Sequence, residues 1–136
     1  MSNKLPDGAG IVVVKKFDDK YKVLGLRLYG KYDIPKGGIE EGEEALIAAV
    51  RETEEESCIS ELSFSWGLEP LVIEGKAKIT VYIAETLQEP VIKKNPHTGI
   101  YEHHAAAWVE WDFMEDRVYN YLKPAIIWAK GVVNDV

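Results

Sequence analysis

Three glutamates near the middle of the chain have the spacing of a carboxylate cluster. Glu52, Glu55 and Glu56 stand at positions i, i+3 and i+4, so on a helix they fall within one arc of roughly 100°. Like charges at these spacings destabilise a helix by roughly 0.2–0.5 kcal/mol per pair, and a bound divalent cation would compensate for this. Carboxylate oxygens suit Mg²⁺ or Mn²⁺, and magnesium in enzymes usually joins protein carboxylates to substrate phosphates. The alternative is a solvated acidic helix face without a ligand.

The residues around these glutamates predict a helix that follows a glycine-rich loop. Residues 35–42 contain three glycines, whereas residues 43–57 contain no Gly or Pro and are rich in Ala and Glu. We expect Glu43 and Glu44 in the first helical turn, where the helix dipole favours negative charge. The face that should pack on the core contains Leu46, Ala49, Val50 and Thr53.

The spacing continues beyond the cluster into a longer signature. Five residues separate Gly37 from Glu43, seven more precede the pair 51–52, and the pair 55–56 follows after two residues. This run resembles the signature of the Nudix hydrolase superfamily. The resemblance implies an α/β fold, namely the Nudix α/β/α sandwich with a mixed β-sheet between helices. It also implies a metal-dependent hydrolase that cleaves pyrophosphate bonds.

The resemblance assigns roles to the residues of the signature. By this resemblance Glu52 and Glu56 are the stronger candidates for ligands of Mg²⁺ or Mn²⁺, and Glu55 is a ligand or a catalytic base. A backbone carbonyl near Lys36 or Gly37 would complete the metal shell, and both residues are candidates for substrate binding.

Two further positions concern the support of the site. Arg51 and Glu43 match family positions that orient the loop and the helix through an ion pair. Cys58 departs from the pattern, which has glycine there. A glycine would suit a left-handed helix end, so with Cys58 the sequence alone does not decide the shape of this turn.

A second polar cluster lies at residues 101–104. On its own it predicts an exposed turn. However, Glu102-His103, one residue, Ala105 and then Trp108 resemble the corresponding stretch of the asymmetrical diadenosine tetraphosphate hydrolases within the superfamily. By that likeness Glu102 is a further metal ligand or the general base for the attacking water, and His103 is a candidate phosphate contact.

Two tyrosines are candidates for stacking on a nucleobase. Tyr32 stands just ahead of the glycine loop, and Tyr82 lies in a β-branched segment that reads as a strand. Tyrosines at such places are more often packing residues, so both interpretations stay open.

The remaining elements follow from local patterns. We expect strands within residues 8–15, 21–28, 61–73, 79–84 and 105–110, with a hairpin turn at 18–20 and an exposed loop at 90–99. Residues 112–115 fit an N-capping box. An amphipathic C-terminal helix should then pack on the sheet, and Pro124 either starts this helix or kinks a longer one. Its apolar face contains Val118, Tyr121, Leu122, Ala125, Ile126 and Ala129.

Composition bounds the class of protein. With 136 residues, 46% of them apolar and 29% charged, we expect a single globular domain over residues 1–136. No apolar run is long enough for a membrane span, the N-terminus lacks a signal-peptide core, and one cysteine fits a cytoplasmic protein. The net charge of −7 argues against binding of long nucleic acids but not of a small nucleotide. The chain is expected to be a monomer or a homodimer.

These observations lead to a functional prediction with alternatives. We expect hydrolysis of a nucleoside diphosphate linked to another group, first of all a dinucleoside polyphosphate such as diadenosine tetraphosphate. The alternative substrates are triphosphorylated RNA ends, nucleoside triphosphates, ADP-ribose and diphosphoinositol phosphates. A Nudix-fold nucleotide sensor without turnover is the alternative outside enzymes, and the intact set of motif glutamates argues against it.

Overall fold

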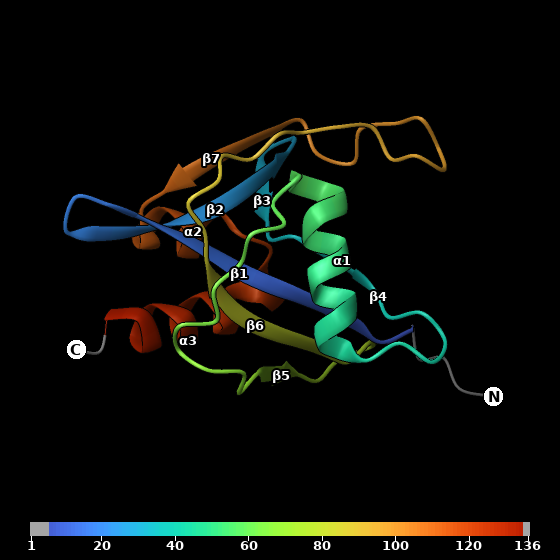
Figure 1. Cartoon of the computed structure of the whole chain (residues 1–136), viewed down its shortest axis with the longest axis horizontal. Coiled ribbons are helices and arrows are strands. Elements are labelled where there is room, and N and C mark those ends of the chain that lie inside the picture. Colours follow the sequence, from blue (N-terminus) through green and yellow to red (C-terminus); the bar gives the residue numbers. More distant parts are fainter. Residues whose placement is uncertain (1–5, 135–136) are drawn as a thin grey trace.

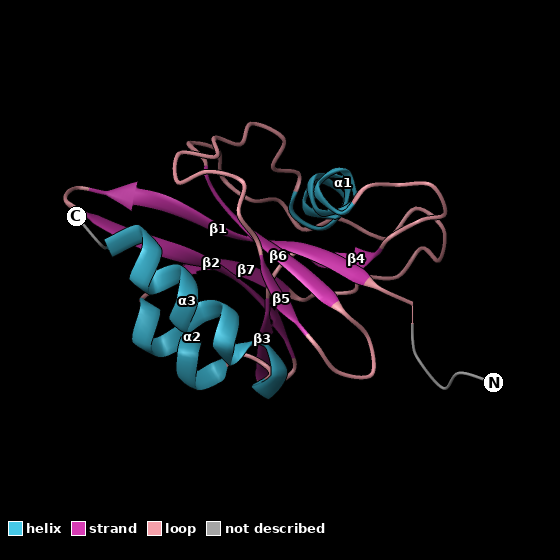
Figure 2. Ribbon diagram, turned by 90° about the horizontal axis from the view of Figure 1, so that it is seen from below, coloured by secondary structure: helices cyan, strands magenta, loops and turns pink. Residues whose placement is uncertain are grey.

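A mixed β-sheet forms the centre of the molecule, with helices on both faces. The computed structural model describes residues 6–134, in which α1 covers one face of the sheet and α2 and α3 cover the other (Figures 1 and 2). The strands are β1 (Gly8–Phe17), β2 (Lys20–Leu28), β3 (Lys31–Asp33), β4 (Lys36–Gly38), β5 (Leu71–Ile73), β6 (Ile79–Glu85) and β7 (Ala105–Val109). The helices are α1 (Ala45–Ser57), α2 (Trp111–Arg117) and α3 (Lys123–Asn134), and a short 3₁₀ helix, η1, spans Asn120–Leu122. This arrangement confirms the expected α/β sandwich.

The sheet is organised on β1. Its strand order is β3-β2-β1-β6-β5, while β4 also pairs with β1 and β7 with β2. The hairpin of β1 and β2 is antiparallel, as the sequence predicts. On its other edge β1 pairs with β6 in parallel, from Gly8 opposite Ile79 to Val14 opposite Glu85. The sheet is therefore mixed, and its central strand is buried on both faces, which explains the continuous β-branched run of β1.

Alternate residues of β1 supply two separate cores. Val12 and Val14 pack with the inner faces of α2 and α3, whereas Ile11 and Val13 pack with α1. Helix α1 contributes Ala48, Ala49 and Thr53 as buried residues, and the expected core residues Leu46 and Val50 are partly buried against the same cluster.

The start of α1 differs from the expectation, and its end shows the shape of a turn that the sequence left open. The helix begins at Ala45, so Glu44 is its N-cap and Glu43 lies outside the first turn, contrary to expectation. Glu43 instead uses its carboxylate to bond the loop and Arg51. At the other end Cys58 adopts the left-handed conformation, with φ 61°, and its N–H donates to Glu54 O at 2.9 Å. The cysteine therefore keeps the turn that a glycine would make.

In the C-terminal third the structure corrects one expectation and decides between two alternatives for Pro124. Residues 112–115 do not cap a helix, because α2 starts at Trp111, whose ring is buried, and has Glu110 as its N-cap. Asp112 lies in the first turn and accepts a hydrogen bond from Lys130 of α3 at 2.8 Å. Pro124 is the second residue of α3, so it starts this helix and does not kink a longer one. Within 61–73 the strand is limited to β5.

None of the helices within residues 6–134 has the length and apolar character needed to cross a bilayer.

Candidate active site

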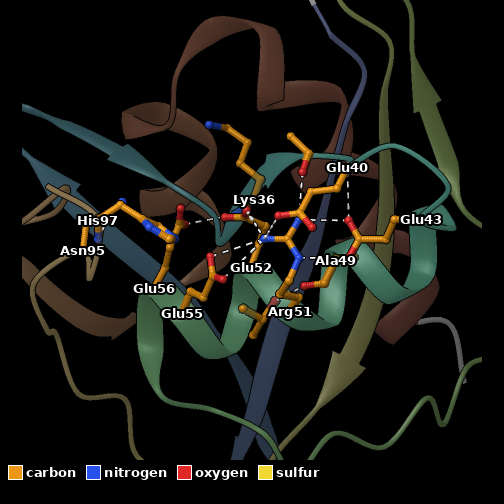
Figure 3. A network of polar contacts seen from close by, with 12 residues as sticks. Lys36, Glu40, Glu43, Ala49, Arg51, Glu52, Glu55, Glu56, Asn95 and His97 are labelled. Atoms are coloured by element: carbon orange, nitrogen blue, oxygen red, sulfur yellow. Dashed lines mark hydrogen bonds and ion pairs between the residues drawn. The ribbon is translucent and has the colours of Figure 1, made fainter.

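A cleft of about 200 Å³ opens along one side of α1. One wall is the polar face of this helix, and the opposite wall is the connection between β6 and β7. Figure 3 shows residues of both walls, with Asn95 and His97 across from Glu56. The cleft is lined by Glu40, Arg51, Glu52, Glu55, Glu56, Ile92, Lys93, Asn95, Pro96, His97, Glu102 and His103.

Four carboxylates predicted as ligands or catalytic groups meet in this cleft. Glu52, Glu55 and Glu56 enter from α1, and Glu102 enters from the segment before β7. Helical spacing explains the first three, whereas the fourth arrives only through the fold. Hard divalent cations prefer such oxygen donors.

Burial disfavours the charged form of two of these carboxylates when no cation is bound. Desolvation raises the pKa of Glu56 to about 9, and the charges of Glu52, Asp33 and Glu102 act in the same direction. The pKa of Glu52 is also raised, again mainly by burial and against a hydrogen bond from Arg51. A bound divalent cation would reverse this balance by stabilising the charged forms. The donor set therefore fits a metal ion.

The protein's own cation at this cluster is Arg51. Its Nη1 donates to Glu52 Oε1 at 2.8 Å and lies 3.4 Å from the carboxylate of Glu55. Within residues 6–134 no three His, Cys, Asp or Glu side chains are already arranged to hold a metal ion. A metal ion would thus draw Glu52 or Glu55 away from the guanidinium.

Arg51 also joins α1 to the glycine loop. Its Nε and Nη2 donate to the two carboxylate oxygens of Glu43, both at 2.9 Å, and Nη2 donates to Gly38 O at 2.9 Å (Figure 3). The N–H of Glu40 donates to Glu43 as well. These bonds, first of all that from Arg51, lower the pKa of Glu43 to about 2. The ion pair that the signature implies is thus present.

The glycine loop contacts two of the glutamates directly. Lys36 donates its backbone N–H to Glu56 Oε1 at 3.1 Å, and Gly37 packs directly against the carboxylate of Glu52. The Lys36 ammonium lies 3.2 Å from Asp33 and 5.7 Å from the centre of the Tyr121 ring. Burial acts to lower the pKa of Lys36, but Asp33 and Tyr121 outweigh it, so the pKa is raised and the side chain stays charged.

The sequence named His103 but gave no sign of other residues at the cleft, such as Asp33, Asn95 and His97. His103 is buried and its Nε2 contacts Asp33 Oδ2 at 3.2 Å, yet nothing in the sequence marks Asp33 as its partner. Residues 90–99 form the expected loop, which is mostly exposed and also provides a wall of the cleft. Asn95 Nδ2 donates to Glu102 Oε1 at 2.8 Å, and Asn95 Oδ1 accepts the N–H of His97 at 2.8 Å. The run of polar residues 93–97 shortly before Glu102 is the signal that could have indicated this.

The two tyrosines proposed to stack on a base lie outside the cleft. Tyr32 packs edge-on against Phe113, with ring centres 5.3 Å apart, on the face covered by α2 and α3. Tyr82 is 8% exposed within the core beneath α1. The structure therefore places both in packing environments.

The sequence matches a known protein family. The family profile described as NUDIX domain matches residues 5–128. No curated protein is similar enough in sequence to give a match.

Solved structures share the fold over nearly the whole chain. An Ap4A hydrolase from C. elegans, in a binary complex, superimposes with a TM-score of 0.76 at 21% identity, covering 97% of this chain and 100% of that one. A Nudix hydrolase from M. smegmatis gives 0.73 at 16% identity over 96% and 87%. The dihydroneopterin triphosphate pyrophosphohydrolase of E. coli gives 0.64 at 21% identity over 96% and 97%. At these identities the likeness shows a common fold.

Proposed function

Because the chain belongs to the NUDIX family, whose members are pyrophosphohydrolases, we propose that it hydrolyses dinucleoside polyphosphates such as diadenosine tetraphosphate. The observation that carries this proposal is the position of Glu102. It faces the three glutamates of α1 across the cleft, and its charge acts on both Glu52 and Glu56. The stretch from Glu102 to Trp108 is also the one that resembles the asymmetrical diadenosine tetraphosphate hydrolases.

The residues of α1 and of the glycine loop form the metal side of the site. We assign Glu52, Glu55 and Glu56 as the groups that hold Mg²⁺ or Mn²⁺, and Glu102 as either a further ligand or the general base. When bound, the metal supplies positive charge to the phosphoryl oxygens and lowers the pKa of water. Glu56 is held for this task by the N–H of Lys36.

The opposite wall provides the proton acceptor and the phosphate contacts. Glu102 is the candidate to take a proton from the attacking water, and the amide of Asn95 fixes the orientation of its carboxylate. His103 is a candidate to contact a substrate phosphate. Lys93 lines the same wall and would offset the negative charge of a polyphosphate chain.

Product analysis of purified protein tests this proposal. Diadenosine tetraphosphate, a nucleoside triphosphate, ADP-ribose and a triphosphorylated RNA oligonucleotide are offered side by side with Mg²⁺, and a chelator serves as control. We expect ATP plus AMP from the first substrate, at a higher rate than turnover of the others. Faster turnover of another substrate would overturn the substrate assignment. Tight nucleotide binding without any turnover would point to a sensor instead.

A further inference from the structure

The buried carboxylate of Asp33 joins two side chains beside the cleft. Asp33 is 6% exposed, and its Oδ2 accepts hydrogen bonds from Lys36 Nζ and from His103 Nε2, at 3.2 Å each. Its Oδ1 accepts the backbone N–H of Ile34 at 2.8 Å. A carboxylate is costly to bury unless it is paired and hydrogen-bonded, so these partners explain how it can lie here.

The contacts of Asp33 connect separate segments of the chain. Asp33 ends β3, Lys36 begins β4, and His103 precedes β7. Lys36 also holds Glu56 through its backbone N–H, whereas His103 directly follows Glu102 in the sequence and lines the cleft beside it. Asp33 therefore links the Glu56 side of the cleft to the Glu102 side.

The same contact determines which nitrogen of His103 carries hydrogen. A carboxylate only accepts hydrogen bonds, so Nε2 must be the donor to Asp33. Nδ1 has no hydrogen-bond partner among residues 6–134, and in a neutral ring it is an acceptor, so it would reach a phosphate oxygen through a bridging water. A histidine ring fixed in this way has a defined orientation in the cleft wall that it lines.

We propose that Asp33 is a positioning residue for the hydrolysis: through His103 it orients the imidazole and the adjoining Glu102 toward the glutamates of α1. This inference rests on the proposed function, which gives His103 and Glu102 their tasks. Asp33 itself is buried away from substrate, so it acts only through its partners. Loss of such supporting hydrogen bonds typically reduces activity by about 10–100-fold.

The test combines Asp33→Asn with His103→Ala on diadenosine tetraphosphate and Mg²⁺. Asp33→Asn should lower kcat about 10–100-fold and change KM by less than about threefold. In the His103→Ala background the same substitution should lower kcat clearly less than it does in the wild type, because only the contact of Asp33 with Lys36 is then left to lose. Independent, multiplicative losses would overturn the proposal.

A matched control separates positioning from general destabilisation. Thr86 is 2% exposed and donates to Glu61 O at 2.8 Å, and it does not line the cleft. Thr86→Val removes two hydrogen bonds of this hydroxyl, the one to Glu61 O and the one from the N–H of Gln88, and should leave kcat unchanged. A comparable loss of kcat in this variant would mean that destabilisation alone accounts for the effect of Asp33→Asn.

A spectroscopic readout does not depend on turnover. Long-range ¹⁵N–¹H spectra of the histidine side chains should show His103 with hydrogen on Nε2 in the wild type, and a changed pattern in Asp33→Asn. An unchanged pattern would overturn the proposal. If the pattern changes but no substrate is hydrolysed by the wild type, the Asp33–His103 contact is supported, while the proposed function fails and with it the catalytic role of Asp33.

Discussion

The carboxylate of Glu52 occupies the space in which a side chain at residue 37 would begin. A Cβ atom built on Gly37 would lie 2.1 Å from Glu52 Cδ and 2.2 Å from its Oε2. A side chain at residue 37 would thus have to displace the carboxylate of Glu52, whereas the backbone angles of Gly37 do not themselves demand a glycine. This relationship joins the two halves of the signature in space.

Substitution of Gly37 should therefore displace Glu52. We expect Gly37→Ala to reduce Mg²⁺-dependent hydrolysis by at least about 10-fold, because the added Cβ atom moves Glu52, which is a candidate ligand of the metal. Gly38→Ala is the matched control, since a Cβ there meets nothing within 4 Å. Steady-state kinetics and a Mg²⁺ titration of both variants give the comparison. Equal activity of the two would contradict the importance of this contact.

Glu56→Gln should abolish turnover without loss of the fold. The neutral amide suits a buried position where the carboxylate already has a pKa of about 9, so the metal-free variant should unfold at no lower urea concentration than the wild type. Turnover should fall at least about 100-fold because a ligand is lost. Glu54, which is exposed on the same helix and outside the cleft, provides the control Glu54→Gln. Activity like that of the wild type in Glu56→Gln would refute the assignment.

The pair of Glu43 and Arg51 should make stability depend on acid pH. Hydrogen bonds, first from Arg51 and then from Glu40, lower the pKa of Glu43 from 4.5 to about 2. The ionised form thus stabilises the folded state above pH 4.5, and this contribution is lost as the pH falls toward 2. Urea unfolding of the wild type and of Glu43→Gln should differ at pH 6 and converge as the pH is lowered through this window. A constant difference would show that the charge of Glu43 is not responsible.

Tyr82 should matter for stability and not for substrate affinity. Because its ring is buried beneath α1, Tyr82→Leu should lower the free energy of unfolding by about 1–3 kcal/mol through altered packing. KM for diadenosine tetraphosphate should stay within about twofold. A large increase in KM with unchanged stability would instead restore the stacking role that the sequence left open.

Cys58→Gly should stabilise the protein. The left-handed conformation that Cys58 adopts costs a residue with a Cβ atom roughly 1–2 kcal/mol. Glycine avoids this cost, but it loses more conformational entropy on folding. We expect a net gain of about 0.5–1 kcal/mol in chemical unfolding. Cys58→Ala, which keeps the Cβ atom, should show no such gain.

Local patterns predicted the parts of the fold that depend on neighbours in sequence. The β1–β2 hairpin and the glutamate face of α1 follow from periodicity, and the spacing of Glu43 and Arg51 is that of a known signature. The capping box at 112–115 failed because α2 begins at the buried Trp111, two residues earlier than an N-cap at Asp112 would allow. Tertiary packing overrode the local signal.

The remaining parts of the site depend on contacts between distant segments. Asp33 meets His103 across seventy positions of sequence, and neither residue type reveals the other. The sequence around Asn95 predicted only an exposed loop. Polar residues in a loop are compatible both with solvent contact and with a binding surface, so the pattern does not separate the two. The sequence therefore indicates the catalytic helix and, on the facing wall, Glu102 and His103, but not the contacts of Asn95 and Asp33 that hold these two residues.

The parallel pairing of β1 with β6 has a consequence for how the chain is made. During synthesis from the N-terminus the β1–β2 hairpin can form early, whereas the other edge of β1 waits for residues 79–85 to leave the ribosome. Until then a strand with the continuous apolar run Ile11 to Val14 presents an unpaired edge to other nascent chains. The interval between translation of β2 and β6 is thus the period in which the polypeptide is most exposed to aggregation.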